Sequence, residues 1–280
     1  MSENLQEFWG GPGRRPVVGV LHPGAMGAAI GAALKGRAGE VLWAAAGRSY
    51  ATSKRAELAD LVAVPDLAAL VRRSDLVISI CPPHAAADVA EQVAAALKTR
   101  EADERPLYLD ANAGSTATMR SIAGTLGAER VVDGAVIGPP AWEHGQSVLW
   151  LAGPHAAAVA ALFEGSPFDA RVLGGPLGSA SALKACFALQ SKALPTAWLL
   201  LAEAAEKAGV APELRSELAR AGVDLDQRLT ALSGKAGTTA WRWAGEMDEA
   251  ADIMAELGMP DGFSRAAAEL YRRMSEQRPD

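Results

Sequence analysis

The first part of the chain alternates short apolar runs with stretches of helical spacing. Runs of strand length fall at residues 17–21, 41–45, 76–80, 107–110, 131–135, 148–152 and 171–173. Helical spacing is clearest at residues 25–35 and 84–97, between such runs. Continuous valine, isoleucine and leucine runs separated by helices are typical of a parallel sheet covered on both faces. The pattern therefore predicts an α/β domain with a doubly wound parallel sheet.

The pattern changes after Gly174-Gly175-Pro176, beyond which no strand-like run follows. Helical spacing then dominates at residues 179–207, 212–221, 223–232, 246–257 and 262–276. Pro195 falls inside the first of these helices and is expected to kink or bend it, because proline has no backbone N–H. We predict a loose tail at residues 1–15, an α/β domain at 16–176 and an all-helical domain at 177–280.

Composition narrows the possible functions. The 280 residues are 50% hydrophobic, have a net charge of −6 and contain no long basic run, and only 5% are aromatic. A nucleic-acid-binding groove needs clustered basic residues, so we expect no nucleic-acid partner. The two cysteines and four histidines have no spacing typical of a disulfide framework or a metal site. No stretch of about 20 uninterrupted apolar residues predicts a membrane span, so we expect a cytoplasmic protein.

One glycine-rich turn points to a cofactor. His22-Pro23-Gly24-Ala25-Met26-Gly27 follows the first predicted strand and opens a helix. This strand, turn and helix form the context of a Rossmann dinucleotide-binding fingerprint, in which His22 takes the place of the first glycine. Gly24 allows a pyrophosphate to approach the backbone, and Gly27 allows the helix to pack on the strand. The turn predicts dinucleotide binding; the alternative is a tight turn without a ligand.

The end of the second predicted strand indicates which dinucleotide is bound. An NAD-preferring site usually has Asp or Glu there to bind the ribose hydroxyls, and this chain has Arg48 and Ser49 instead. A guanidinium and a hydroxyl suit the 2′-phosphate of NADP, so we predict NADP (NADPH) in preference to NAD. The alternative interpretation is a solvated basic loop.

Two later loops are expected to complete the cofactor site, since the carboxyl ends of parallel strands form the ligand crevice. Cys81-Pro82-Pro83 follows one strand, and Asn112 lies in the loop after the next. Cys81 is expected to be a small contact residue. Asn112 is the better candidate for substrate contact, because its amide can orient a carboxylate, carbonyl or amide group.

Three segments resemble one enzyme superfamily. Residues 18–27 (VGVLHPGAMG) are similar to the N-terminus of the β-hydroxyacid dehydrogenase and 6-phosphogluconate dehydrogenase superfamily. Residues 133–139 (DGAVIGP) resemble its substrate loop, and residues 178–184 (GSASALK) its catalytic-lysine motif. Further segments, AWRWAGEM at 240–247 and GMPDGF at 258–263, resemble a branch with a C-terminal domain of unknown function 1932.

The resemblance implies a Rossmann domain, a helical domain built on a long interdomain helix, and a homodimer with its site between domains. It also implies hydride transfer between a nicotinamide and a carbonyl, alcohol or imine carbon, with Lys184 as general acid/base. Ser181 lies one turn before Lys184, so it is expected either to orient the lysine or touch substrate, or to be a small helix contact. Lys192, two turns beyond Lys184, is expected to be solvated.

Several positions depart from the pattern of the superfamily. Phe187 and Ala188 stand where an asparagine is usual after the lysine, and Ile137 replaces the usual serine of the substrate loop. Near the C-terminus, Gly245-Glu246 replaces a Lys-Asp pair. These changes remove groups that would bind a hydroxy-acid carboxylate, so the predicted substrate is a small, relatively apolar carbonyl or alcohol. The alternatives are an imine reductase and a non-catalytic dinucleotide-binding sensor.

Overall fold

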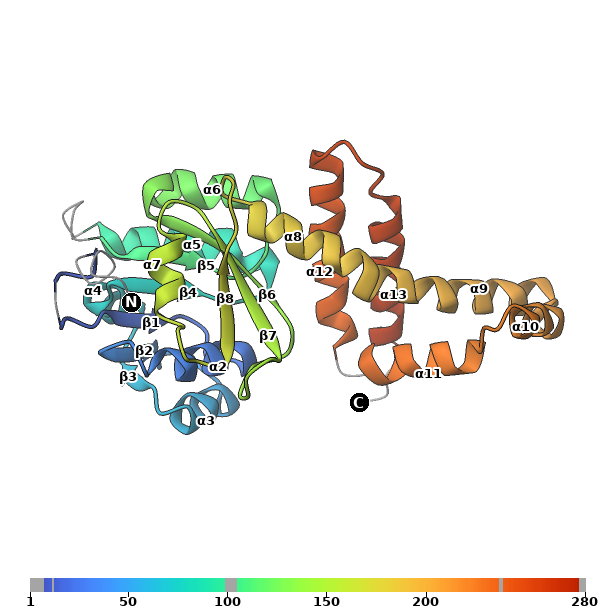
Figure 1. Cartoon of the computed structure of the whole chain (residues 1–280), viewed down its shortest axis with the longest axis horizontal. Helices are drawn as coiled ribbons and strands as arrows, with labels where there is room; N and C mark the ends of the chain where they lie inside the picture. Colours follow the sequence, from blue (N-terminus) through green and yellow to red (C-terminus); the bar gives the residue numbers. More distant parts are fainter. Residues whose placement is uncertain (1–7, 12, 99–104, 237–238, 277–280) are drawn as a thin grey trace. The chain divides into compact units, whose positions relative to one another are not determined.

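The chain forms two compact units in a computed structural model that describes residues 8–11, 13–98, 105–236 and 239–276. The first unit is residues 1–184 and the second is residues 185–280 (Figure 1). The division falls inside helix α8 (Ser179–Ala188), whereas the sequence placed the domain boundary just before that helix. Part of the tail predicted at residues 1–15 lies outside the described residues.

The first unit is built on an eight-stranded sheet with strand order β3-β2-β1-β4-β5-β6-β7-β8. The strands are β1 (Val17–Val20), β2 (Glu40–Ala44), β3 (Val62–Val64), β4 (Leu76–Ser79), β5 (Leu107–Asp110), β6 (Val131–Ile137), β7 (Ser147–Ala152) and β8 (Phe168–Val172). The six strands from β1 to β6 run parallel to one another. The predicted doubly wound fold is therefore confirmed.

The prediction of a fully parallel sheet is wrong for its last two strands. Strand β7 pairs antiparallel with β6, and β8 pairs parallel with β7, so both run against the other six. The reason is the connection between β6 and β7, which is a loop at residues 138–146. A parallel pair needs a crossover of a dozen or more residues, usually a helix, whereas an antiparallel pair can be joined by a short loop.

Strand β3 has no counterpart in the sequence prediction. It is three residues long, lies at the edge of the sheet beside β2, and exposes Val62 and Ala63 while burying only Val64. Its three residues are all apolar, but the strand is shorter than the runs of about four to eight residues that indicate a strand.

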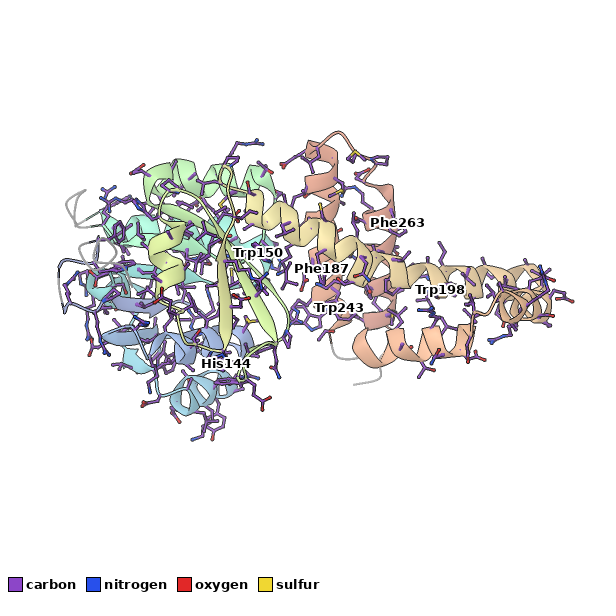
Figure 2. The ribbon with its side chains drawn as sticks, viewed as in Figure 1. His144, Trp150, Phe187, Trp198, Trp243 and Phe263 are labelled. Carbon is purple, nitrogen blue, oxygen red and sulfur yellow. The ribbon has the colours of Figure 1, made fainter. Side chains whose placement is uncertain are left out.

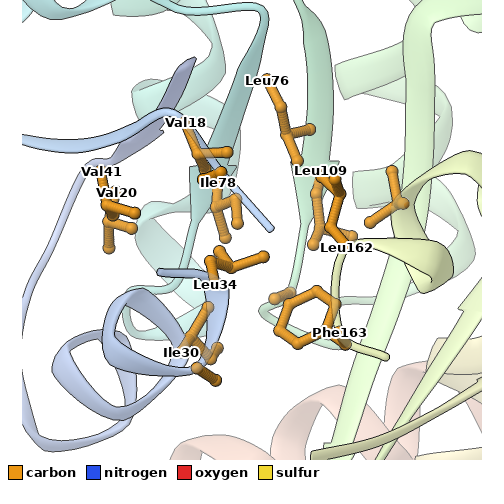
Figure 3. Packing of buried hydrophobic residues seen from close by; sticks show 14 of the residues in the cluster. Val18, Val20, Ile30, Leu34, Val41, Leu76, Ile78, Leu109, Leu162 and Phe163 are labelled. Atoms are coloured by element: carbon orange, nitrogen blue, oxygen red, sulfur yellow. The ribbon is translucent and has the colours of Figure 1, made fainter. Parts of the chain in front are cut away.

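Helices cover both faces of the sheet. They are α2 (Ala25–Leu34), α3 (Tyr50–Leu58), α4 (Leu67–Arg73), α5 (Ala86–Leu97), α6 (Thr116–Leu126) and α7 (Ala156–Ala161). On one face, Ile30 and Leu34 of α2 pack with Val20 and Ile78 of the sheet (Figure 3). The opposite face buries a second cluster that includes Val77, Tyr108, Val89, Met119 and Ile122. The alternation of strand residues between two apolar layers explains the continuous apolar runs in the sequence.

The second unit is helical. It contains the end of α8, the π-helical turn η4 (Leu189–Ala193), α9 (Leu194–Ala208), α10 (Ala211–Arg220), α11 (Leu225–Ala236), α12 (Ala240–Glu256) and α13 (Gly262–Glu276). Helix α12 begins at Ala240, earlier than the predicted start at residue 246. Its first turns carry Trp241 and Trp243, which have low helix propensity, but Ala240 and Ala244 are buried and hold them in the helix.

The break expected at Pro195 takes the form of a π-helical turn. The backbone N–H of Leu194 donates to the carbonyl of Leu189, five residues back. Pro195 has no N–H to donate, and the hydroxyl of Thr196 donates to the carbonyl of Ala193 at 2.7 Å. Such turns inside α-helices are often found at functional sites.

One helix within the described part of the chain is long and apolar enough to cross a membrane. This is the continuous helix Ser179–Ala208. Its most apolar window of 18 residues has a mean hydropathy of 1.2, and 22% of that window is buried. The central helix of a water-soluble protein meets the same criterion, so length and composition do not decide between the two environments.

Candidate functional site

The predicted cofactor turn connects β1 to α2. Gly24 is the N-cap of α2 in an extended conformation, and no side chain caps the first turn in the described structure. The N–H of Ala28 donates to the carbonyl of Gly24 at 2.9 Å and begins the helical hydrogen bonds. The amide groups before it have no partner within the helix, and with the positive end of the helix dipole they form an anion-binding site.

The two glycines of the turn have different surroundings. A Cβ atom at Gly24 would meet nothing within 4 Å, whereas one at Gly27 would collide with the backbone carbonyl of His22. The first glycine therefore faces open space in front of the helix, and the second lets α2 pack against the end of β1. A turn that is open at one glycine and closed at the other fits a dinucleotide pyrophosphate lying against the backbone.

This turn lies at the point where the strand order reverses. Strand β1 is flanked by β2 on one side and β4 on the other, and each of these pairs parallel with it. Chain connections leave this position in opposite directions, and in α/β folds ligands bind outside the carboxyl ends of the strands at such a point. Arg48, Cys81 and Asn112 follow the carboxyl ends of β2, β4 and β5. The structure therefore brings these predicted residues to the same edge of the sheet as the turn.

Arg48 joins the ends of the first two strands. Its Nη2 donates to the carbonyl of Leu21 at 2.9 Å, and its Nε donates to the carbonyl of Ala44 at 3.4 Å. Ser49 next to it caps helix α3, because its hydroxyl accepts from the backbone N–H of Thr52 at 3.3 Å. A guanidinium and a helix N-terminus thus lie together beyond β2, and both favour an anion there.

His22 occupies the first glycine position of the usual fingerprint. The imidazole is half-buried, and its Nδ1 atom is enclosed without a hydrogen-bond partner among the described residues. Burial, together with the charge of Arg48, lowers the pKa of His22 to about 4. The imidazole is therefore neutral at physiological pH and adds no charge to the turn.

Asn112 holds two loops together. It is 5% exposed, and its Nδ2 donates to Ser79 Oγ at 3.0 Å and to Asp110 Oδ1. Its Oδ1 accepts from the backbone N–H of Cys81 at 2.5 Å. Each polar atom of the amide thus binds the protein itself. The substrate contact predicted for Asn112 has no support in this geometry, and the side chain organises the ends of β4 and β5 instead.

The Cys81 loop is consistent with a contact role. Burial raises the pKa of the Cys81 thiol to about 11, so the sulfur is protonated and a poor nucleophile at neutral pH. Pro82 is exposed on the loop, and Pro83 begins a short 3₁₀ helix, η1 (Pro83–Ala85). The prediction that Cys81 is a small contact residue remains a prediction.

The helix that carries Lys184 starts against the sheet of the first unit. Ala180 is buried in a cluster with Ala113, Ala135 and Ala152, so the loop that follows Asn112 packs on the first turn of α8. Lys184 is half-buried, one turn further along the helix. The first unit therefore brings together the Asn112 loop and the start of the lysine-bearing helix.

Ser181 has a different partner from those expected. It is 1% exposed, and its hydroxyl donates to Asp133 Oδ1 at 2.6 Å. The structure therefore turns Ser181 toward β6. Sequence reasoning did not single out Asp133, although an aspartate inside the apolar strand sequence VVDGAVI is itself a signal. Burial raises the pKa of Asp133, and hydrogen bonds from Ser181 and nearby backbone amides oppose that shift.

The prediction that Lys192 is solvated is wrong. Within the second unit, its ammonium forms an ion pair with Glu246, and the two side chains are only 16% and 17% exposed. The ammonium also lies 5.9 Å from the centre of the Trp243 ring, which is labelled in Figure 2. The Trp243 ring packs edge-on against Tyr271, at 5.4 Å between centroids. The π-helical turn places Lys192 in this cluster, and helical spacing alone does not reveal it.

Comparison with known proteins identifies the C-terminal part. Residues 205–274 match the family described as Domain of unknown function (DUF1932). An uncharacterised 28.5 kDa protein of Methanothermus fervidus, from the 5′ region of its 7S RNA, is 31% identical over 176 residues. That match covers 62% of this chain and 65% of the relative, so the chain spans less than two thirds of the curated relative.

Solved structures extend the likeness to both units. The conserved protein MTH1747, whose structure is similar to 3-hydroxyacid dehydrogenases, matches with a TM-score of 0.66 and 22% identity over 93% of this chain and 97% of its own. The 3-hydroxyisobutyrate dehydrogenase of Mycobacterium tuberculosis, solved with L-serine, matches with a TM-score of 0.64 and 18% identity over 94% of both chains. A reductive aminase of Aspergillus terreus, solved with NADPH4, cyclohexanone and allyl amine, matches with a TM-score of 0.52 and 18% identity over 94% of both.

These matches confirm the resemblance to the β-hydroxyacid dehydrogenase superfamily at the level of the fold. They also confirm the branch with the domain of unknown function 1932.

Proposed function

We propose that this protein is an NADP-dependent oxidoreductase that transfers hydride between NADPH and a small, relatively apolar carbonyl or alcohol substrate. The observation that carries the proposal is the start of α2, where an uncapped helix N-terminus lies at the reversal of strand order. Gly24 leaves open space there, and Gly27 is required for close packing. These are the features by which a Rossmann turn binds a pyrophosphate.

The preference for NADP rests on the residues beyond β2. Arg48 and the start of α3, capped by Ser49, supply positive potential where the adenosine ribose would lie. Residues 44–49 contain no acidic side chain to bind the free 2′-hydroxyl of NAD. Both features favour a 2′-phosphate, so we expect NADPH to bind more tightly than NADH.

Lys184 is the proposed general acid/base. Bound NADPH would supply the hydride, and reduction of a carbonyl also needs a proton at the oxygen. In the reverse direction the same amine would withdraw a proton from the alcohol. Lys184 matches the catalytic-lysine motif and is half-buried on α8.

Imine reduction is a second candidate, because a reductive aminase solved with NADPH4, cyclohexanone and allyl amine shares this fold across both units. In that reaction the substrate can arrive as a protonated iminium ion, so Lys184 is not required as proton donor. The loss of polar groups at Ile137 and Phe187 suits an apolar imine as well as an apolar carbonyl.

Two measurements test the proposal. Thermal shift or calorimetry with NADPH and NADH tests the cofactor, and we expect a larger effect from NADPH. NADPH oxidation with panels of carbonyls and imines tests the reaction. Carbonyl turnover should fall by about 10²-fold or more in Lys184→Ala, with NADPH affinity retained. Unchanged carbonyl turnover would refute the lysine mechanism, and NADPH binding without any turnover would indicate a sensor.

We also propose a homodimer in the cytoplasm, without nucleic-acid or membrane partners. The support is a row of half-exposed apolar side chains on the second unit, including Phe187, Leu194 and Leu200, along a helix that is mostly unburied in the single chain. A second copy would cover such a surface. Light scattering at micromolar concentration should give the mass of a dimer; a monomer, or a protein recovered with membranes, would contradict this proposal.

A further inference from the structure

Asp133 is a charged residue in the interior of the sheet. It is the third residue of β6, is fully buried, and has apolar residues on both sides along the strand. A carboxylate in such a place is costly unless hydrogen bonds compensate it. Its position therefore calls for a functional or structural reason that packing does not supply.

The compensating bonds come from the start of α8 and from Gly178 just before it. Oδ2 of Asp133 accepts from the backbone N–H of Ala180 at 2.8 Å and from that of Ser181 at 3.3 Å. Oδ1 accepts from the Ser181 hydroxyl at 2.6 Å. A side chain of the sheet thus caps the helix from 47 and 48 residues away in sequence. The negative charge also lies at the positive end of the helix dipole, where it is stabilised.

The bonds define where Lys184 lies relative to the sheet. Ser181 and Lys184 are three residues apart on a helix, so their side chains share a face. Three hydrogen bonds to one carboxylate, two from Ser181 and one from Ala180, fix both the rotation and the height of the first turn. The side chain of Lys184 starts one turn beyond that fixed point.

Asp133 also has a neighbour that connects it to the cofactor loops. Its Cα partner on the adjacent parallel strand is Asp110, the last residue of β5. Asp110 accepts a hydrogen bond from Asn112, which in turn holds the Cys81 loop. The two buried carboxylates, one on each strand, therefore hold the cofactor loops and the lysine-bearing helix at adjacent positions of the sheet.

We propose that Asp133 is a positioning residue for Lys184: by binding Ser181 and the first amides of α8, it holds the lysine in register with the loop of Asn112. The inference rests on the proposed function for its catalytic meaning. Its structural claim, that the Asp133–Ser181 contact sets the environment of the lysine amine, does not depend on the substrate.

The test therefore measures the lysine amine directly. Purified full-length protein is labelled with trace acetic anhydride across a range of pH, and the rate at Lys184 is read by mass spectrometry against exposed lysines of the same chain. The variants are Asp133→Asn and Ser181→Ala. Ser179→Ala is the matched control, because its hydroxyl donates to the carbonyl of Pro176, at the same helix end, and not to Asp133.

We expect the labelling rate of Lys184 to rise at least about threefold in Asp133→Asn, and by a smaller factor in Ser181→Ala, which retains the backbone bonds. Its dependence on pH should change in both variants and remain that of the wild type in Ser179→Ala. If Asp133→Asn does not fold, Ser181→Ala alone decides the question.

A lowered melting temperature with an unchanged labelling profile at Lys184 would overturn the proposal, since Asp133 would then act on stability alone. Failure of the proposed function has a separate signature. It would appear as wild-type protein that does not bind NADPH, whatever the labelling of Lys184 shows.

Discussion

The guanidinium of Arg48 donates a hydrogen bond to the carbonyl of Leu21, 2.9 Å away, and so joins the ends of two neighbouring parallel strands. Leu21 immediately precedes the cofactor turn. Arg48 can therefore act in two ways: it can hold the strand ends in place, and it can supply positive charge to a bound cofactor. Measuring the binding of both NADPH and NADH to one Arg48 variant separates the two effects.

Replacing Arg48 with alanine should weaken NADPH binding more than NADH binding. Loss of a charge-assisted contact to a 2′-phosphate predicts an increase of about tenfold or more in the Kd for NADPH, since such bonds contribute about 1.5–3 kcal/mol. Binding of both cofactors is measured by calorimetry, with Lys54→Ala on the exposed face of α3 as control. An equal loss for NADPH and NADH would show that Arg48 acts only on the strand ends.

The two glycines of the turn should respond in opposite ways to alanine. Gly27→Ala places a methyl group against the His22 carbonyl, so the free energy of unfolding should fall by about 2 kcal/mol or more. Gly24→Ala meets no protein atom, so its stability should stay near that of the wild type while NADPH binding is lost. Urea unfolding and calorimetry on both variants check this. A Gly24→Ala protein that binds NADPH normally would place the pyrophosphate elsewhere.

The buried imidazole of His22 should make stability depend on pH. Its pKa is about 4 in the folded protein and about 6.5 when unfolded, so the unfolded chain takes up a proton first as pH falls. The stability from a neutral His22 is complete above pH about 6.5 and is lost as pH falls from there to about 4.

With solvent screening, we expect His22 to contribute about 1–2 kcal/mol to this loss. Urea unfolding at several pH values should show a smaller decline for His22→Asn than for the wild type, whereas the exposed His84 changed to Asn should follow the wild type. Parallel declines for His22→Asn and wild type would mean that the imidazole is as accessible as a free histidine.

The ion pair of the second unit should matter for stability. Glu246→Gln removes the carboxylate that pairs with the mostly buried Lys192 ammonium and with Arg242, so we expect a loss of about 2 kcal/mol or more in the free energy of unfolding. The exposed pair Arg220–Glu217 provides the control, and Glu217→Gln should change stability by less than about 0.5 kcal/mol. Equal effects in the two variants would show that the Lys192 pair is as solvated as the control.

Much of the first unit could be predicted from periodicity because its strands are buried on both faces and its helices lie between them. The cofactor turn could be predicted for a similar reason, since a strand, two glycines and a helix in close succession have few alternatives. The edge strand β3 could not, because a strand with one buried residue has no distinctive pattern. The direction of β7 and β8 could not either, since an apolar run is the same read in both directions.

The hydrogen-bond partners of the polar side chains at the candidate site could not be predicted from the sequence, for a different reason. Ser181 was placed correctly beside Lys184 on the helix, yet its hydroxyl binds Asp133 on a distant strand. Asn112 was placed correctly in the loop after β5, yet its amide binds three groups of the protein. Helical spacing and strand ends fix where a side chain begins, whereas its hydrogen-bond partners depend on which other segments the fold brings near.

The reversed orientation of β7 and β8 determines the direction in which helix α8, which carries Lys184, runs. Because β8 runs antiparallel to β1, the chain leaves β8 at the amino ends of the parallel strands, opposite the glycine-rich turn. Leu177 lies there, beside Gly153 and Val131. Helix α8 then rises past Asp133 toward the carboxyl ends of the parallel strands. If β8 ran parallel to β1, helix α8 would instead start at the carboxyl ends of the parallel strands. Lys184 would then lie farther from the glycine-rich turn. Two strands that contribute none of the predicted site residues thus set the direction in which the helix with Lys184 runs.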